Sequence, residues 1–332
     1  MICDMHCDTI SVLLRKEMEN KDSNLRSNNT MIDLNKMKGG NYLLQTFAMF
    51  IFLKAFDHPY DAVCDMIDKY YREIDSNSDL IKPVYSYDDI IKNHENGLMS
   101  SLLSIEEGGV LMGKLSNLRN LYRLGVRMLT LTWNFENEIG YPNNFKKDNS
   151  TIGSSKIDSK VPNTEYGLKP FGIEVVKEME KLGMIIDVSH LSDKGFYDVY
   201  ENTTKPFVAS HSNSRTVCSH VRNMTDDMIL KLASRGGVMG INYCDRFINN
   251  DEPYTVYVKD LVKHINYIRD LAGIDCIGLG SDFDGINKNH EMDDASKLHL
   301  LKEELIKEGY SESDIEKIFY KNVLRVFKEC LK

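Results

Sequence analysis

The chain has 332 residues and a formal net charge of −9, with 41 basic and 50 acidic residues mixed along its length. This balance argues against a surface for a phosphate backbone, so nucleic acid is not an expected partner. The length fits two ordinary domains or one large α/β barrel, since such barrels commonly exceed about 250 residues.

Short apolar runs alternate with amphipathic stretches along the chain, which is the pattern of βα units around a parallel sheet. The predicted strands are 2–8, 44–50, 100–106, 127–133, 184–190, 207–211, 238–243 and 276–282. Helices are predicted at 57–75, 115–124, 171–182, 225–234 and 256–272, followed by two or three closing helices at about 294–331. Eight such units favour a single (β/α)8 TIM barrel domain spanning 1–332 over an open doubly wound sheet.

A polar segment at about 134–169 interrupts this pattern and has no clear periodicity. It is longer than a typical βα loop, and in a barrel it would lie over the C-terminal face. We therefore expect an active-site insert, either a lid or a pocket wall, and not a linker between domains.

The first predicted strand ends in "HCD", where His6 and Asp8 are two residues apart. Residues i and i+2 of a strand point to the same face, so these two side chains should face together and Cys7 should face away. A thiolate site made by Cys3, His6 and Cys7 is disfavoured, because strand alternation places the histidine opposite both cysteines.

Side chains that can bind a metal also end four other predicted strands: Glu106, His190, His211 and Asp282. Each has a structural alternative, since a histidine can be hydrogen-bonded in the core and a carboxylate can cap a helix or form an Asx turn. In a barrel, however, the C-terminal ends of strands meet at one mouth. The six side chains together therefore predict a metal site.

Imidazole and carboxylate ligands without thiolates suit zinc or a related divalent ion. Six ligands are enough for two ions if one carboxylate bridges them. Such a pair would hold a hydroxide between the metals and polarise a carbonyl oxygen, which is the chemistry of amide hydrolysis.

Several motifs, in this order along nearly the whole chain, resemble those of the membrane (renal-type) dipeptidase family, peptidase family M19. They are "HCD", "SIEEGG", "DVSH", "SHS" followed by "RNMTDD", "GLGSDFDG" and the closing "EEGYSESDIEKIFYKNVLRVF". The resemblance implies an amidohydrolase-type metal-dependent hydrolase with two Zn²⁺ ions, which cleaves dipeptides, including those with a C-terminal D-residue.

The resemblance also implies roles for individual residues. His6 and Asp8 would bind one zinc ion, Glu106 would bridge, and His190 and His211 would bind the other. Asp282 would lie beside the first ion and carry a proton from water to the leaving amine. Arg222 in "VRNMTDD" matches the arginine that holds the C-terminal carboxylate of the substrate, a task suited to a bidentate guanidinium.

One position departs from the family. Where the mammalian pattern is "LTLTH", this chain has "LTLTW", which places Trp133 near the substrate carbonyl. An indole donates a hydrogen bond but takes no proton, so the metals, Trp133 or Asn134 would stabilise the carbonyl, unless Trp133 only packs the pocket wall. Two alternatives therefore stay open: a binuclear amidohydrolase for another small amide or lactam, and a metal- or peptide-binding protein without turnover.

The seven cysteines form no short framework, which predicts free thiols and a cytoplasmic location. No apolar stretch is long enough to span a membrane, and the sequence has neither a signal peptide nor a C-terminal anchor, so no membrane attachment is expected. The resemblance implies a small dipeptide as substrate and a homodimer. No stripe of residues in the sequence shows where the dimer interface would lie.

Overall fold

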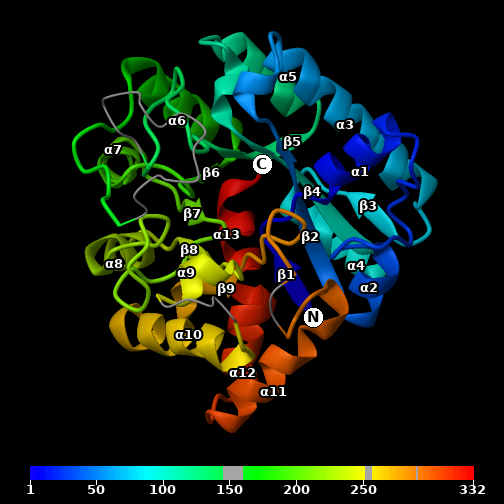
Figure 1. Cartoon of the computed structure of the whole chain (residues 1–332), viewed down its shortest axis with the longest axis vertical. Helices are drawn as coiled ribbons and strands as arrows, with labels where there is room; N and C mark the ends of the chain where they lie inside the picture. The colour runs from blue at the N-terminus through cyan, green and yellow to red at the C-terminus, as the bar shows by residue number, and fades with distance from the viewer. Residues whose placement is uncertain (145–159, 251–255, 289–290) are drawn as a thin grey trace.

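The computed structural model describes residues 1–144, 160–250, 256–288 and 291–332 (Figure 1). Eight parallel strands form a closed ring: β1 (Ile2–Asp4), β2 (Tyr42–Phe50), β4 (Met99–Glu106), β5 (Val126–Thr130), β6 (Ile185–Asp187), β7 (Val208–Ala209), β8 (Val238–Ile241) and β9 (Ile277–Leu279). β2 pairs directly with β4, and β9 pairs with β1, which closes the ring. The predicted (β/α)8 TIM barrel is confirmed, and the open doubly wound sheet is wrong.

The longest strands, β2 and β4, are buried over almost their entire length. Strands covered by helices on the outside and packed in the barrel interior need no polar face, which explains why YLLQTFAMF and MSSLLSIE lack a strict alternation. A short strand, β3 (Ile81–Pro83), pairs with the beginning of β4 outside the ring and was not predicted.

Helices surround the ring (Figure 1). They are α1 (Thr9–Met18), α2 (Leu34–Gly39), α3 (Pro59–Ser76), α4 (Tyr87–Glu95), α5 (Leu115–Arg123), α6 (Pro170–Leu182), α7 (Asp193–Asn202), α8 (Asp226–Ser234), α9 (Asp245–Ile248) and α10 (Val258–Ala272). The five predicted helices match α3, α5, α6, α8 and α10 within two residues at each end. Local signals explain their ends: the Thr225 side chain accepts from Met228 N at the start of α8, and α6 stops at Gly183 in a left-handed conformation.

The closing helices cover the N-terminal end of the barrel. They are α11 (His299–Lys307), α12 (Glu312–Glu316), the π-helical turn η5 (Lys317–Lys321) and α13 (Asn322–Cys330), which crosses the ring in Figure 1. Asn322 Nδ2 donates to the carbonyl of Ile277 at the start of β9 (2.9 Å), and Cys330 Sγ contacts the carbonyl of Pro206 just before β7 (3.2 Å). The opposite, C-terminal end of the barrel is therefore left for the site.

Part of the predicted insert at about 134–169, namely 145–159, lies outside the described residues. Its described parts pack beside the loop that follows β6, where Asn143 N donates to the carbonyl of His190 (2.8 Å) and Pro142 forms an isolated bridge with Leu191. Among the described residues, no helix has the length and apolar character required to cross a bilayer. All seven cysteines are free.

Candidate active site

The six predicted metal ligands meet at the C-terminal end of the barrel, but only Glu106 lies within its strand. The predicted strands were too long: β1 ends at Asp4, β6 at Asp187, β7 at Ala209 and β9 at Leu279. His190 and Asp282 have φ values of 67° and 62°, which a β-strand does not accommodate. The other five residues therefore occupy turns directly after the strands.

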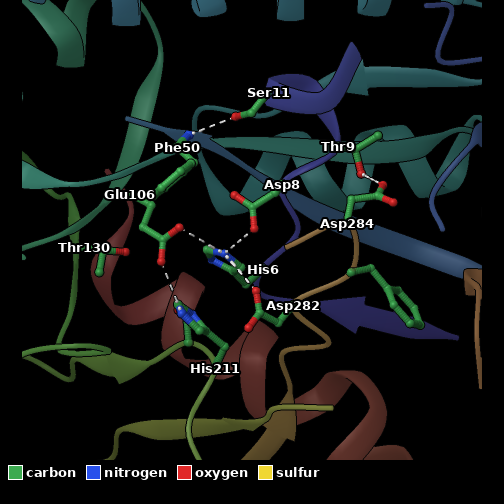
Figure 2. A network of polar contacts seen from close by, with 12 residues as sticks. His6, Asp8, Thr9, Ser11, Phe50, Glu106, Thr130, His211, Asp282 and Asp284 are labelled. Carbon is green, nitrogen blue, oxygen red and sulfur yellow. Dashed lines mark hydrogen bonds and ion pairs between the residues drawn. The ribbon is translucent and has the colours of Figure 1, made fainter. Parts of the chain in front are cut away.

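Glu106 lies between two groups of side chains (Figure 2). Its Oε2 is 3.6 Å from His6 Nε2, whereas its Oε1 is 3.0 Å from His190 Nε2 and 3.4 Å from His211 Nε2. Asp8 Oδ2 and Asp282 Oδ1 approach His6 Nε2 at 3.5 and 3.8 Å. The ligand atoms form three overlapping groups, each within 4.8 Å: His6, Asp8 and Glu106; Glu106, His190 and His211; His6, His211 and Asp282.

Burial sets the electrostatics of this cluster. It raises the pKa of Glu106 well above its usual range and that of Asp282 to about 6, with repulsion from Asp8 adding to both. Burial alone would lower the pKa of His6, but the neighbouring carboxylates Glu106 and Asp8 raise it to about 10. Three carboxylates thus crowd one imidazole, and a divalent cation between them would relieve their repulsion.

The unpaired atoms of the cluster fit a metal. His6 Nε2 and Asp8 Oδ1 are buried and lack a hydrogen-bond partner among the described residues. Such atoms are costly to bury unless something binds them. Cys3 and Cys7 are buried, and no described cysteine belongs to the three groups, so their donors are nitrogen and oxygen atoms. This donor set suits zinc or a similar divalent ion.

Two of the histidines have their second ring nitrogen held. Asn134 Oδ1 is 2.8 Å from His190 Nδ1 and, as a carbonyl oxygen, can only accept, so Nε2 keeps its lone pair for the cluster. Asn134, expected to contact the substrate, is thus placed to orient a ligand, although its side chain also lines the cavity described below.

His211 is held by a longer chain of bonds. Its Nδ1 is 2.7 Å from Ser210 Oγ, which donates to Asp187 Oδ2 at 2.6 Å, and Thr130 Oγ1 donates to the same oxygen at 2.6 Å. Sequence reasoning missed Asp187 and Ser210. A signal was present, because Asp187 is a carboxylate within the apolar run MIIDV and is fully buried.

The turn after β9 joins the site to α1. Asp284 accepts from Thr9 Oγ1 at 2.7 Å (Figure 2), and from Met31 N at 2.7 Å. The next residue, Gly285, passes close to the cluster: a Cβ there would lie 2.1 Å from Asp8 Oδ2 and 2.6 Å from Asp282 Oδ1. Only glycine leaves room for both carboxylates.

A cavity of about 500 Å³ opens above the cluster. Its polar floor includes Asp8, Glu106, His190 and Asp282, and its walls include Phe50, Trp133 and Phe247. The Trp133 ring lies edge-on to Phe50 at 4.9 Å between centroids and 6.1 Å from the ring of His190. Trp133 is therefore a wall residue adjacent to His190, a candidate metal ligand.

Arg222 lies behind this wall and does not line the cavity itself. Its guanidinium carbon is 5.3 Å from the ring centre of Phe247, and its Nη atoms donate to Ser212 Oγ and to the carbonyl of His211. Its Nε is buried without a partner among the described residues, and no described carboxylate forms an ion pair with it. The guanidinium of Arg222 therefore keeps an unused hydrogen-bond donor, Nε, beside the candidate metal cluster.

Comparisons with known proteins agree on one family. The model described as "Membrane dipeptidase (Peptidase family M19)" matches residues 1–332. An uncharacterized dipeptidase of Schizosaccharomyces pombe is 33% identical over 349 aligned positions, covering 99% of this chain and 80% of that protein.

Two solved structures share the fold. A metallopeptidase described as dipeptidase AC of family M19 superposes with a TM-score of 0.88 at 24% identity, covering 99% of this chain and 98% of its own. A metallopeptidase from Rhodobacter sphaeroides, solved with a phosphinate mimic of the dipeptide L-Ala-D-Ala, gives 0.87 at 23% identity, with 99% of each chain covered.

Proposed function

Because this chain belongs to peptidase family M19, whose members are metal-dependent dipeptidases, we propose that it hydrolyses dipeptides with two zinc ions held by the cluster around Glu106. The observation that carries the proposal is the position of that carboxylate. One of its oxygens faces His6 and the other faces His190 and His211. A carboxylate shared in this way would bind one ion with each oxygen.

The proposed ligands divide between two ions. His6, Asp8 and Glu106 would hold the first, and Glu106, His190 and His211 the second. Zinc bound there would supply Lewis acidity toward the scissile carbonyl and a water activated at neutral pH. The protein's own contribution is to hold the ligands rigidly, through Asn134 for His190 and Ser210 for His211.

We assign the proton transfer to Asp282. Its Oδ2 is held by Asn242 Nδ2 at 2.9 Å, which leaves Oδ1 facing the cluster, 3.8 Å from His6 Nε2. In this position the carboxylate would take the proton of the attacking water and return it to the leaving nitrogen as the amide bond breaks. Glu106 and Asp282 are thus the proposed catalytic carboxylates.

The substrate would be held at its C-terminus. The buried guanidinium of Arg222, with a free Nε, suits the carboxylate of a dipeptide once Phe247 moves aside. Trp133 forms the opposite wall and would donate its indole N–H toward the peptide carbonyl, in place of the family's histidine. We propose that a D-residue is accepted at the second position, which the ligand of the Rhodobacter sphaeroides relative supports.

The test is release of free amino acids from matched L,L and L,D dipeptides, Ala-Ala first, by chelator-stripped and zinc-reconstituted protein. We expect zinc-dependent release from both series, with two zinc ions per chain. Glu106→Gln should lose at least one ion and lower kcat/KM by roughly 10³-fold or more, because metal catalysis contributes several kcal/mol.

Glu303→Gln, an exposed position on α11, is the matched control and should leave zinc content and rate unchanged. A protein that binds two zinc ions and releases no amino acid would refute the proposed reaction. If Glu106→Gln keeps both ions and full activity, the bridging assignment is wrong.

A further inference from the structure

One wall of the cavity carries a cation that no described carboxylate pairs with. Arg15 lines the cavity together with Ser11 and Val12, which lie on the same side of α1. Among the described residues no carboxylate lies within ion-pair distance of its guanidinium, and the acid one turn away, Glu19, is paired with Lys21 at 2.6 Å. Arg15 is exposed, so its charge is available at the mouth.

Two lysines extend this positive region. Lys16 Nζ donates to Asn29 Oδ1 at 2.5 Å, and Lys288 Nζ donates to the carbonyl of the same asparagine at 3.4 Å. Neither lysine has an ion-pair partner among the described residues. Lys288 directly follows Asn287, which lines the cavity. We call Arg15, Lys16 and Lys288 the cationic rim.

The carboxylates of the cavity form no ion pair with the rim. Asp8, Glu106 and Asp282 belong to the metal cluster, and Asp284 accepts hydrogen bonds from the hydroxyl of Thr9 and the amide of Met31. The chain as a whole carries a net charge of −9. Three neighbouring cations that form no ion pair with a described carboxylate, on an acidic protein, create a local field that would attract an anionic ligand.

The barrel order places the rim away from Arg222. In the ring, β1 is followed by β9, β8 and β7, so α1 follows a strand three places from the one whose loop carries Arg222. If Arg222 holds the C-terminal carboxylate of a dipeptide, the first residue has room to extend across the cavity toward Arg15 on α1. A carboxylate on that first side chain would reach the rim.

We propose that the cationic rim selects dipeptides whose N-terminal residue has an acidic side chain, aspartate or glutamate. This inference rests on the proposed dipeptidase function and names its substrate class. The cationic rim would bind the side chain of the first residue, whereas Arg222 would bind the terminal carboxylate that every dipeptide has.

The experiment compares kcat/KM of the zinc-loaded enzyme for Glu-Ala and its neutral isostere Gln-Ala. We expect a ratio of roughly fivefold at low ionic strength, since a few exposed charges act together, and a smaller ratio at about 0.5 M salt, where screening is strong. Arg15→Gln should bring the ratio toward one, and Arg15→Lys should keep most of it. Lys302→Gln removes the same charge at the opposite, closed end of the barrel, where Lys302 pairs with Glu312 at 2.8 Å, and should leave the ratio unchanged.

A wild-type ratio near one, or a ratio that Arg15→Gln does not change, would overturn the inference. A preference found only for Ala-Glu over Ala-Gln would overturn the placement of the first residue at the rim. If none of these dipeptides, nor Ala-Ala, is hydrolysed by protein that holds zinc, the proposed function fails and the inference with it.

Discussion

The hydroxyl of Ser210 connects a metal-ligand candidate to a buried carboxylate. Ser210→Ala would leave His211 Nδ1 without its acceptor and Asp187 Oδ2 without one of its donors. We expect the zinc affinity to fall about 10- to 100-fold, as is typical for loss of such a supporting contact. Competition with a chromophoric chelator measures this affinity directly.

The control for this variant is Ser101→Ala, which deletes a buried hydroxyl on β4 that bonds to Tyr70 and Lys82 instead of to a ligand. It should lower the free energy of unfolding without changing the zinc affinity. Equal zinc affinities for Ser210→Ala and the wild type would contradict the role given to the chain from His211 to Asp187.

The residues that gather at the barrel mouth could be predicted from the sequence, but the residues that support them could not. His6, Glu106 and Asp282 each follow an apolar run, which local pattern reveals. The bond between Thr9 and Asp284 joins residues 275 positions apart, and no local pattern encodes that neighbourhood. Arg222 was expected in contact with the pocket, but its position behind Phe247 depends on packing between two loops.

Among the helices, Lys69 of α3 links α1 to α3 through an ion pair with Glu17. Its Nζ, 2% exposed, contacts Glu17 Oε2 at 2.5 Å and Glu73 Oε1 at 2.7 Å. Lys69→Met would leave Glu73 buried without its cation, so we expect a loss of about 3 kcal/mol in the free energy of unfolding, measured by denaturant titration. Lys21→Met, which breaks an exposed pair, should cost less than about 1 kcal/mol.

The same contact predicts a pH dependence. Hydrogen bonds from Arg72 and Lys69 lower the pKa of Glu17 to about 2 from an ordinary value of 4.5. Because the folded pKa lies below the unfolded one, this stabilisation is present above pH 4.5 and is lost as the pH falls toward 2. Thermal unfolding across that range should show a smaller loss for Lys69→Met than for the wild type. Parallel curves would contradict this assignment.

Elements with strong periodicity were predictable, and short or edge elements were not. All eight barrel strands were located, because each is an apolar run with a turn signal. The predicted C-terminal ends of the strands lie up to four residues beyond the observed ends. After its last strand residue the chain continues as a turn whose polar side chains still point toward the mouth of the barrel. β3 has three residues and one barrel neighbour, too little for a sequence signal.

For the whole molecule, the metal cluster gathers loops from five of the barrel strands, so metal removal should loosen the open end of the barrel. We expect a chelator to lower the melting temperature and zinc to restore it. Free zinc at about 100 times its Kd should add about 2.7 kcal/mol per occupied site to the free energy of unfolding. Differential scanning calorimetry measures both changes.

Magnesium at the same concentration is the control ion and should restore little, because it prefers an all-oxygen shell. If the melting temperature is the same with chelator and with zinc, the cluster holds no metal in the folded protein. We propose that the chain is one domain, in which case the transition should be a single cooperative one.

The pairing of Asp4 in β1 with Leu279 in β9 has a consequence for biosynthesis. A ribosome delivers the strand that precedes His6 first and the strand that precedes Asp282 last, after nearly all of the chain has been made. Under the proposed assignment, a nascent polypeptide carries five of the six site residues once His211 has been made, and it still lacks Asp282. We therefore expect catalysis only after the final barrel strand has docked, so truncated products of synthesis would not cut peptides.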